Sequence, residues 1–215
     1  MNLKHIFSKG PKSPEDKAER FWKWFAKNQQ QFLFITSVSV EEKDRMLNEF
    51  LEELHKYDEN LYFEMGGHPD DQKVELIITA EGNIEAFPSV ELLVGKAPSF
   101  ESWEVIAFKP PMGTGFTTEY GGYSFDPEKI LFIPLKNPDN PQAIGLKVCY
   151  PDYREEDRNI FINGSFIMLD VILGEKSCVE DIDYLDAAQT PENIVDYPFR
   201  SLSNIKSYID EVKAR

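Results

Sequence analysis

The spacing of apolar residues predicts two amphipathic helices near the start of the chain. Ser13 and Pro14 are typical of a helix start, a capping serine followed by proline in the first turn. The apolar residues that follow recur at helical spacing and are Ala18, Phe21, Trp22 and Phe25. Ser39 and Glu42 match a capping box that opens a second helix. Its apolar stripe is Met46, Leu47, Phe50, Leu51 and Leu54.

Runs rich in β-forming residues, bounded by turn residues, follow this helical hairpin. Residues 61–67 and 73–80 predict two strands joined by the turn-rich segment GGHPDDQ. Further strands are predicted at 102–108, 116–120, 130–135, 143–150 and 179–185. Pro134 cannot donate a ladder hydrogen bond, so its strand is predicted to be bulged or to lie at an edge.

Three more helices are predicted between and after these strands. Asn83 is a typical cap for a helix that runs to about Gly95, and a second helix is predicted over residues 157–174. A final helix is predicted from one shared apolar face, made of Phe199, Leu202, Ile205, Ile209 and Val212. Residues 1–12 are predicted to form a flexible tail.

The order of the elements predicts an α+β fold, because strands occur in runs with helices outside them. No long linker rich in Pro, Gly or Ser divides the chain. We therefore expect a single domain over residues 13–215, with an N-terminal helical hairpin packed on a mainly antiparallel sheet of about five to seven strands. A chain of 215 residues can bury a core without a disulfide or a metal.

The acidic composition of the chain restricts the kinds of molecule that it is expected to bind. The formal net charge is −15, from 38 acidic and 23 basic residues. Such a field repels a phosphate backbone, so we expect no nucleic-acid binding, whereas a basic protein partner is favoured. The N-terminus lacks the apolar core of a signal peptide, and no apolar run approaches the roughly 18 residues of a membrane span. We therefore expect a cytoplasmic protein that does not bind a membrane.

Searches for catalytic and cofactor motifs return little. The two cysteines, Cys149 and Cys178, are far apart and are expected to be free thiols. No C-x-x-C or H-x-x-x-H pair suggests zinc, and G-x-S-x-G is absent. We expect no cofactor.

The glycine-rich segment at residues 110–122, PPMGTGFTTEYGG, could cradle phosphate or form a turn. A phosphate cradle needs a helix directly after the glycines, and here β-rich residues follow. Neither the Walker pattern nor a complete G-x-G-x-x-G is present. The segment is therefore predicted to be a turn, and a small-ligand site at this loop is the weaker alternative.

His68, Asp70 and Asp71 form the candidate reactive cluster. An imidazole beside two carboxylates could hold a divalent metal or act as a base with its orienting acid. The same residues are also common in a polar hairpin turn. Trp24 points away from the apolar face of the first helix and is a candidate surface contact.

Asp181, Asp183 and Asp186 form a second acidic cluster. The spacing of the first two resembles the start of a calcium loop, but Leu185 and a missing glycine break that pattern. A solvated face of the strand at 179–185 is the prediction we prefer.

Several stretches resemble an uncharacterised family of bacterial conserved proteins that share a domain of unknown function. They are FWKWF (21–25), ELIITAEGNIEAFPSVELLVGKAP (75–98) and LDVILGE (169–175). The resemblance runs from about residue 20 to 175. It implies a single bacterial cytoplasmic α+β domain and carries no established site.

Two functions of different classes follow from these observations. The first is a non-catalytic interaction or regulatory module, inhibitor-like or immunity-like, whose acidic surface meets a basic protein. The alternative is a metal-assisted hydrolase that uses His68, Asp70 and Asp71. The sequence does not indicate an oligomeric state.

Overall fold

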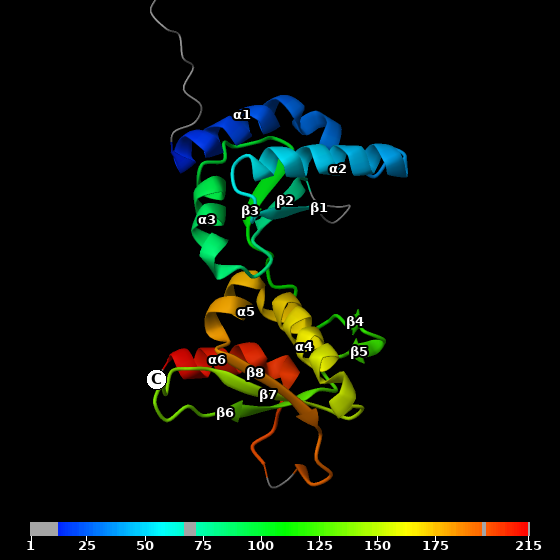
Figure 1. Cartoon of the computed structure of the whole chain (residues 1–215), viewed down its shortest axis with the longest axis vertical. Coiled ribbons are helices and arrows are strands. Elements are labelled where there is room, and N and C mark those ends of the chain that lie inside the picture. Colours follow the sequence, from blue (N-terminus) through cyan, green and yellow to red (C-terminus); the bar gives the residue numbers. More distant parts are fainter. Residues whose placement is uncertain (1–12, 67–71, 195–196, 215) are drawn as a thin grey trace, which may run out of the picture. The chain divides into compact units, whose positions relative to one another are not determined.

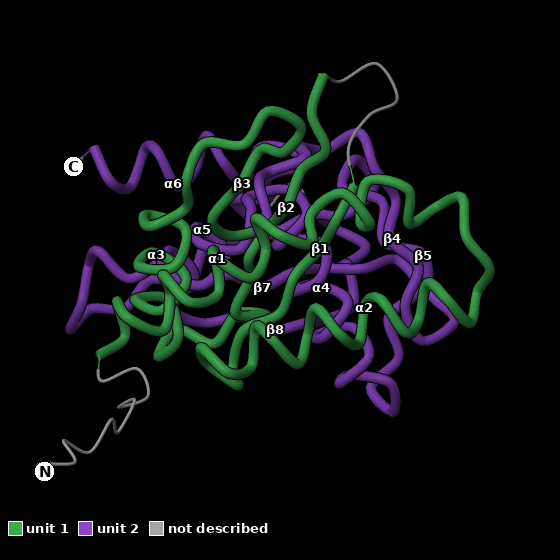
Figure 2. The backbone as a smooth tube through the Cα atoms, turned by 90° about the horizontal axis from the view of Figure 1, so that it is seen from above, with its two compact units in different colours: residues 1–108 green, residues 109–215 purple. Residues whose placement is uncertain are grey.

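The computed structural model describes residues 13–66, 72–194 and 197–214. The chain divides into two compact units, residues 1–108 and 109–215, which Figure 2 colours separately. Both units combine helices with a sheet, so the predicted α+β class is confirmed (Figure 1). The single domain predicted over residues 13–215 stays a prediction.

Unit 1 begins with the predicted helical hairpin. α1 (Pro14–Phe32) starts at Ser13, whose hydroxyl accepts a hydrogen bond from the Asp16 amide while the Asp16 carboxylate accepts one from the Ser13 amide. α2 (Val40–His55) starts at Ser39, which caps the Glu42 amide. Both predicted helix starts are confirmed.

A three-stranded sheet completes unit 1. It consists of β1 (Tyr62–Gly66), β2 (Val74–Thr79) and β3 (Trp103–Ala107), in the order β1-β2-β3. β1 is antiparallel to β2, and β2 is parallel to β3. The parallel step crosses over through a short 3-10 turn, η1 (Ile84–Ala86), and α3 (Phe87–Gly95). Asn83 caps this turn as predicted.

The core of unit 1 lies between its helices and one face of the sheet. The rings of Phe50 in α2 and Phe63 in β1 have centroids 4.1 Å apart, and those of Phe25 in α1 and Trp103 in β3 are 5.3 Å apart. Trp22 of α1 donates its indole N–H to a carbonyl of α3. Side chains alternate along a strand, so the next residues of β1 point to the opposite face.

Unit 2 contains a small hairpin and a four-stranded sheet. The hairpin is β4 (Thr118–Tyr120) and β5 (Tyr123–Phe125). The sheet has the order β8-β7-β6-β9. Its strands are β6 (Leu131–Leu135), β7 (Gly145–Tyr150), β8 (Tyr184–Gln189) and β9 (Arg200–Ser201). The helices are α4 (Arg158–Leu173), α5 (Glu175–Asp181) and α6 (Ile205–Lys213), with 3-10 turns η2 (Glu155–Asp157) and η4 (Leu202–Asn204).

Strand pairing in this sheet is mixed. β6 is antiparallel to β7 and to β9, whereas β7 is parallel to β8. The inward side chains of β7, including Leu146 and Val148, are buried in one cluster with residues of α4 and α6. The helix predicted over 157–174 is confirmed by α4.

Three predictions about the strands and the last helix are wrong. The described residues form three sheets of three, two and four strands, so there is no single sheet of five to seven. The strand predicted over 179–185 is the end of α5 followed by the start of β8. Phe199 precedes β9, and the last helix begins only at Ile205.

The two units share one strand motif that the sequence does not reveal. An antiparallel pair, a helical crossover and a parallel third strand occur as β1-β2-α3-β3 and again as β6-β7-α4-α5-β8. Phe63 and Phe132 are both the second residue of a five-residue first strand, and they pair with Ile78 and Val148. By its place in the motif, β1 therefore corresponds to β6, and Phe63 corresponds to Phe132.

No helix within the described ranges is both long and apolar enough to cross a bilayer.

Candidate functional site

The reactive cluster predicted from the sequence lies outside the described residues. His68, Asp70 and Asp71 all fall within residues 67–71. Among the residues that the structure describes, no group of three or more His, Cys, Asp or Glu could hold a metal ion. The metal-assisted hydrolase therefore stays a prediction without a described site.

Trp24 lies at the margin of the helical hairpin core. Its side chain is half-buried, and its ring centroid is 5.7 Å from that of Phe50 and 6.0 Å from that of Phe32. One side of the ring therefore packs on the hairpin. A role as a surface contact stays a prediction.

The second acidic cluster is not a strand face. Asp181 ends α5 and pairs with Lys213 at 2.7 Å, while Asp183 accepts a hydrogen bond from the Ile144 amide at 2.7 Å. Asp186 lies on β8. Each carboxylate has a different partner, so the predicted common face is wrong.

The glycine-rich segment leads into a hairpin. Gly121 and Gly122 have φ of +59° and +85° and connect β4 to β5, the geometry that a tight two-residue hairpin turn requires. Upstream, the Met112 amide donates to the Val171 carbonyl of α4 at 2.8 Å. The predicted turn is confirmed at Gly121 and Gly122, and the Ile160 side chain in the first turn of α4 fills the space beside Gly121.

Both cysteines are buried thiols. Burial raises the pKa of Cys149 to about 11 and that of Cys178 to about 12. A thiol with a raised pKa is protonated at neutral pH and is a poor nucleophile. Neither cysteine has the environment of a catalytic residue.

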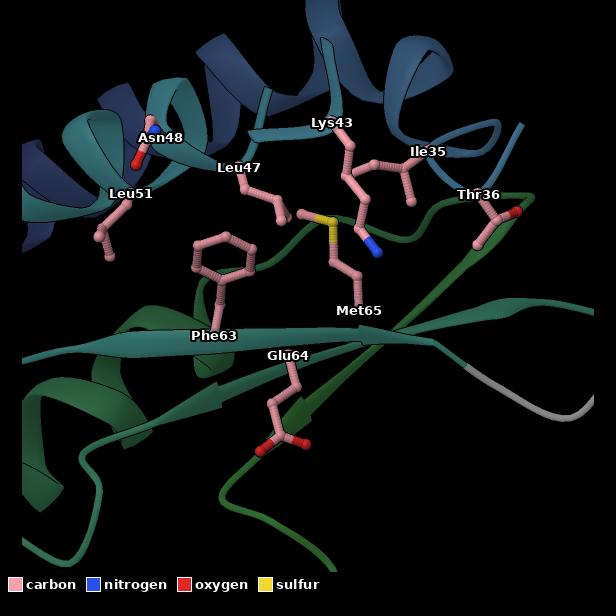
Figure 3. A pocket seen from close by; sticks show the side chains of 9 residues that line it. All are labelled: Ile35, Thr36, Lys43, Leu47, Asn48, Leu51, Phe63, Glu64 and Met65. Carbon is pink, nitrogen blue, oxygen red and sulfur yellow. The ribbon is translucent and has the colours of Figure 1, made fainter. Parts of the chain in front are cut away.

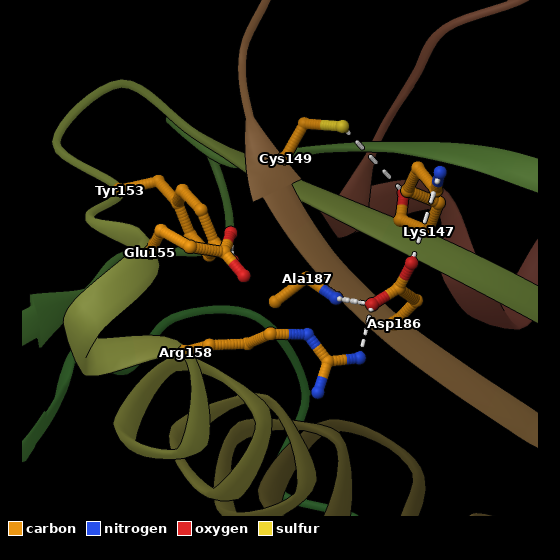
Figure 4. A network of polar contacts seen from close by, with 7 residues as sticks. All are labelled: Lys147, Cys149, Tyr153, Glu155, Arg158, Asp186 and Ala187. Atoms are coloured by element: carbon orange, nitrogen blue, oxygen red, sulfur yellow. Dashed lines mark hydrogen bonds and ion pairs between the residues drawn. The ribbon is translucent and has the colours of Figure 1, made fainter.

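A polar network joins β8 to the start of α4 (Figure 4). Asp186 accepts hydrogen bonds from the Arg158 guanidinium at 2.7 Å and from the Ala187 amide at 2.9 Å, and Lys147 Nζ lies 3.7 Å away. Burial by itself would raise the pKa of Asp186, but these hydrogen bonds outweigh it and the pKa is lowered. β8 is an edge strand, and the network links it to β7 and to α4.

One cavity of unit 2 is built from the loop between β6 and β7. Its volume is about 460 Å³, and Leu135, Asn140 and Tyr184 are among its lining residues. The Asp183 carboxylate in this lining is already bonded to the Ile144 amide. The cavity therefore contains no free acid–base pair.

The groove of unit 1 lies between α2 and β1 (Figure 3). It has a volume of about 400 Å³ and is lined by Ile35, Thr36, Lys43, Leu47, Asn48, Leu51, Phe63, Glu64 and Met65. Leu47 and Leu51 of α2 point toward Phe63 and Met65 of β1, whereas Glu64 points to the other face of the sheet. We call this feature the α2–β1 groove.

Several of the side chains that meet in the α2–β1 groove are apolar and only partly covered. Leu47, Leu51, Phe63 and Met65 are all half-buried. β1 is the edge of its sheet, paired with β2 on one side. The groove therefore combines exposed apolar surface with the hydrogen-bonding edge of a strand.

The outer rim of the groove is acidic. Asp44 and Glu52 are exposed and lie one helical turn before and after Asn48. α2 as a whole carries more acidic than basic residues. Lys43 and Arg45 are its lysine and arginine, and the alkyl chain of Lys43 extends over the groove toward Met65.

The sequence contained a partial signal for this groove. Leu47 and Leu51 were predicted to belong to a buried stripe, together with Met46, Phe50 and Leu54. In the structure only those last three are buried. Leu47 and Leu51 remain half-buried and line the groove.

Comparisons of the chain with protein-family models, curated proteins and solved structures find no significant match. The resemblance described from the sequence therefore stays a resemblance.

Proposed function

We propose that this protein is a non-catalytic interaction module that binds a basic partner protein through the α2–β1 groove. One observation carries the proposal. Partly covered apolar side chains of α2 and of the edge strand β1, among them Leu47 and Met65, face each other across the groove. Open apolar surface rimmed by polar residues is typical of a protein-binding site.

Charge supports a basic partner. The net charge of −15 and the acidic rim at Asp44 and Glu52 attract positive surfaces. Complementary charge speeds association and rejects wrong partners, while buried apolar contacts supply most of the affinity. By covering a functional surface of that partner, the module would act as a regulator, in the manner of an inhibitor or immunity factor.

Site-specific photo-crosslinking tests this proposal. Benzoylphenylalanine replaces Asn48 in the groove, and a matched variant carries it at Asn140, which lines the cavity of unit 2. We expect Asn48→benzoylphenylalanine to crosslink a basic protein in the native host, with a yield that falls as salt rises. We expect the Asn140 variant to give no such product.

A second variant links the crosslink to the groove itself. Leu51→Glu places a charge on the apolar wall, so we expect it to abolish the crosslink at position 48 while circular dichroism and thermal melting show a folded protein. Equal products from positions 48 and 140, or a product that Leu51→Glu leaves unchanged, would contradict the proposal.

A further inference from the structure

The corresponding edge in unit 2 already carries an added strand. β6 corresponds to β1, and the outer edge of β6 pairs antiparallel with β9. Arg200 lies opposite Phe132 and Ser201 opposite Leu131. Within the described part of unit 1, no strand occupies the matching edge of β1. Unit 2 therefore shows how a segment can bind at this position of the motif.

The side chains in and after β9 show which types of residue can bind beside the outer edge of β6. Arg200 pairs with Glu211 of α6 at 2.9 Å, and its guanidinium lies 5.0 Å from the centre of the Tyr208 ring. Two residues later, Leu202 is fully buried, and its amide donates to the Ile130 carbonyl at 2.9 Å. β9 thus places a basic side chain against α6, and two positions later the first residue of the 3-10 turn η4 places an apolar side chain in the core.

α2 holds the place in unit 1 that α6 holds in unit 2. The Phe132 ring packs on Tyr208 of α6 at 5.5 Å, and the corresponding Phe63 ring packs on Phe50 of α2 at 4.1 Å. Both helices lie over the first strand of their motif and carry acidic residues. The α2–β1 groove therefore lies where β9 and its side chains lie in unit 2.

We infer that the α2–β1 groove binds an extended segment of the partner as an added strand, antiparallel to β1. The segment has the pattern Leu-x-Arg-x-Leu, in which each Leu stands for a bulky apolar residue. By the correspondence with β9, the basic residue lies opposite Phe63 and reaches toward the acidic rim of α2. The first apolar residue lies opposite Met65 and fills the groove beside Leu47. The inference rests on the proposed function and specifies its binding mode.

The test uses phage-displayed peptides of twelve residues against the full chain. One library has a central Leu-x-Arg-x-Leu with all other positions random, and the control library has Leu-x-Glu-x-Leu. We expect binders from the first library only, because Glu would face the acidic rim. Binders that come equally from both libraries would overturn the inference.

Two variants locate the binding. We expect Met65→Lys to weaken a selected peptide at least tenfold, because charge at a strand edge and in an apolar groove opposes strand addition. Leu135→Lys, the matched half-buried strand residue that lines the cavity of unit 2, should leave affinity unchanged within twofold. If Met65→Lys does not fold, Leu51→Glu on the opposite wall replaces it. Binding that survives both groove variants would overturn the inference.

N-methylation of the peptide backbone distinguishes an added strand from a bound helix. In a strand, alternate amides face β1, so methylation should abolish binding at every second position and be tolerated between them. Equal loss at all positions indicates a helix and overturns the strand mode while the proposed function stands. A concentration-dependent dimer in light scattering, with no peptide binding, would identify a second copy as the occupant and also overturn the inference.

Discussion

At the residue scale, Gly164 shows how a position that weakens a helix can be required by packing. It lies inside α4 and is buried. A Cβ atom placed there would lie 2.1 Å from the Phe125 ring, far closer than van der Waals contact allows. The helix therefore accepts the entropic cost of glycine so that β5 can pack against it.

We expect Gly164→Ala to destabilise the protein by about 1–3 kcal/mol, because the steric cost exceeds the roughly 1 kcal/mol that alanine gains in helix propensity. Urea unfolding measures the change in free energy. Gly95→Ala is the matched control, since Gly95 ends α3 and a Cβ there meets no atom within 4 Å. A Gly164→Ala protein as stable as the Gly95→Ala protein would show that β5 moves aside at little cost.

For Pro134, the sequence predicted only part of what the structure shows about its strand. It was predicted to lie at an edge or in a bulge. β6 lies between β7 and β9, but β9 pairs only with Leu131 and Phe132. Pro134 therefore lies beyond the part of β6 that β9 covers, where no amide is needed on that side.

At the element scale, the Asp186 network ties the edge strand β8 to α4. The lowered pKa means that the unfolded chain takes up a proton on this carboxylate at a higher pH than the folded protein does. The stabilisation is therefore fully present above the ordinary pKa of 3.8, and it is lost as the pH falls through the lowered value.

We expect Asp186→Asn to lower the free energy of unfolding at neutral pH and to make its decline between about pH 5 and pH 2 shallower. Urea titrations at a series of pH values measure both effects. Asp139→Asn is the control, because it removes an exposed carboxylate from the turn after β6. It should change neither the free energy of unfolding at neutral pH nor its decline at low pH. Parallel pH profiles for the native protein and Asp186→Asn would contradict the role given to this network.

At the scale of the whole molecule, each unit is a repeat of one strand motif with different additions. Unit 1 precedes the motif with α1 and α2, and unit 2 follows it with β9 and α6. The main buried cluster of unit 2 is formed by residues between Phe125 and Val212 alone. Such a core should not need unit 1 in order to form.

We therefore expect residues 109–215, expressed alone, to unfold cooperatively in urea and to keep a near-ultraviolet circular dichroism signal from their buried tyrosines. The urea transition and the circular dichroism signal of the full chain serve as the reference. A fragment that shows no cooperative transition would instead support the single domain predicted over residues 13–215.

By itself, the sequence determined the class of fold, the starts of α1 and α2, the helix at 158–173 and the turn at Gly121. These features depend on capping side chains, apolar periodicity and backbone freedom, which act over a few neighbouring residues. Only the tertiary structure decided the division of the sheets, the short β9, the repeated motif and the opening of the α2–β1 groove. Those depend on which strand edges meet and which remain uncovered, and that is set by contacts between residues far apart in the chain.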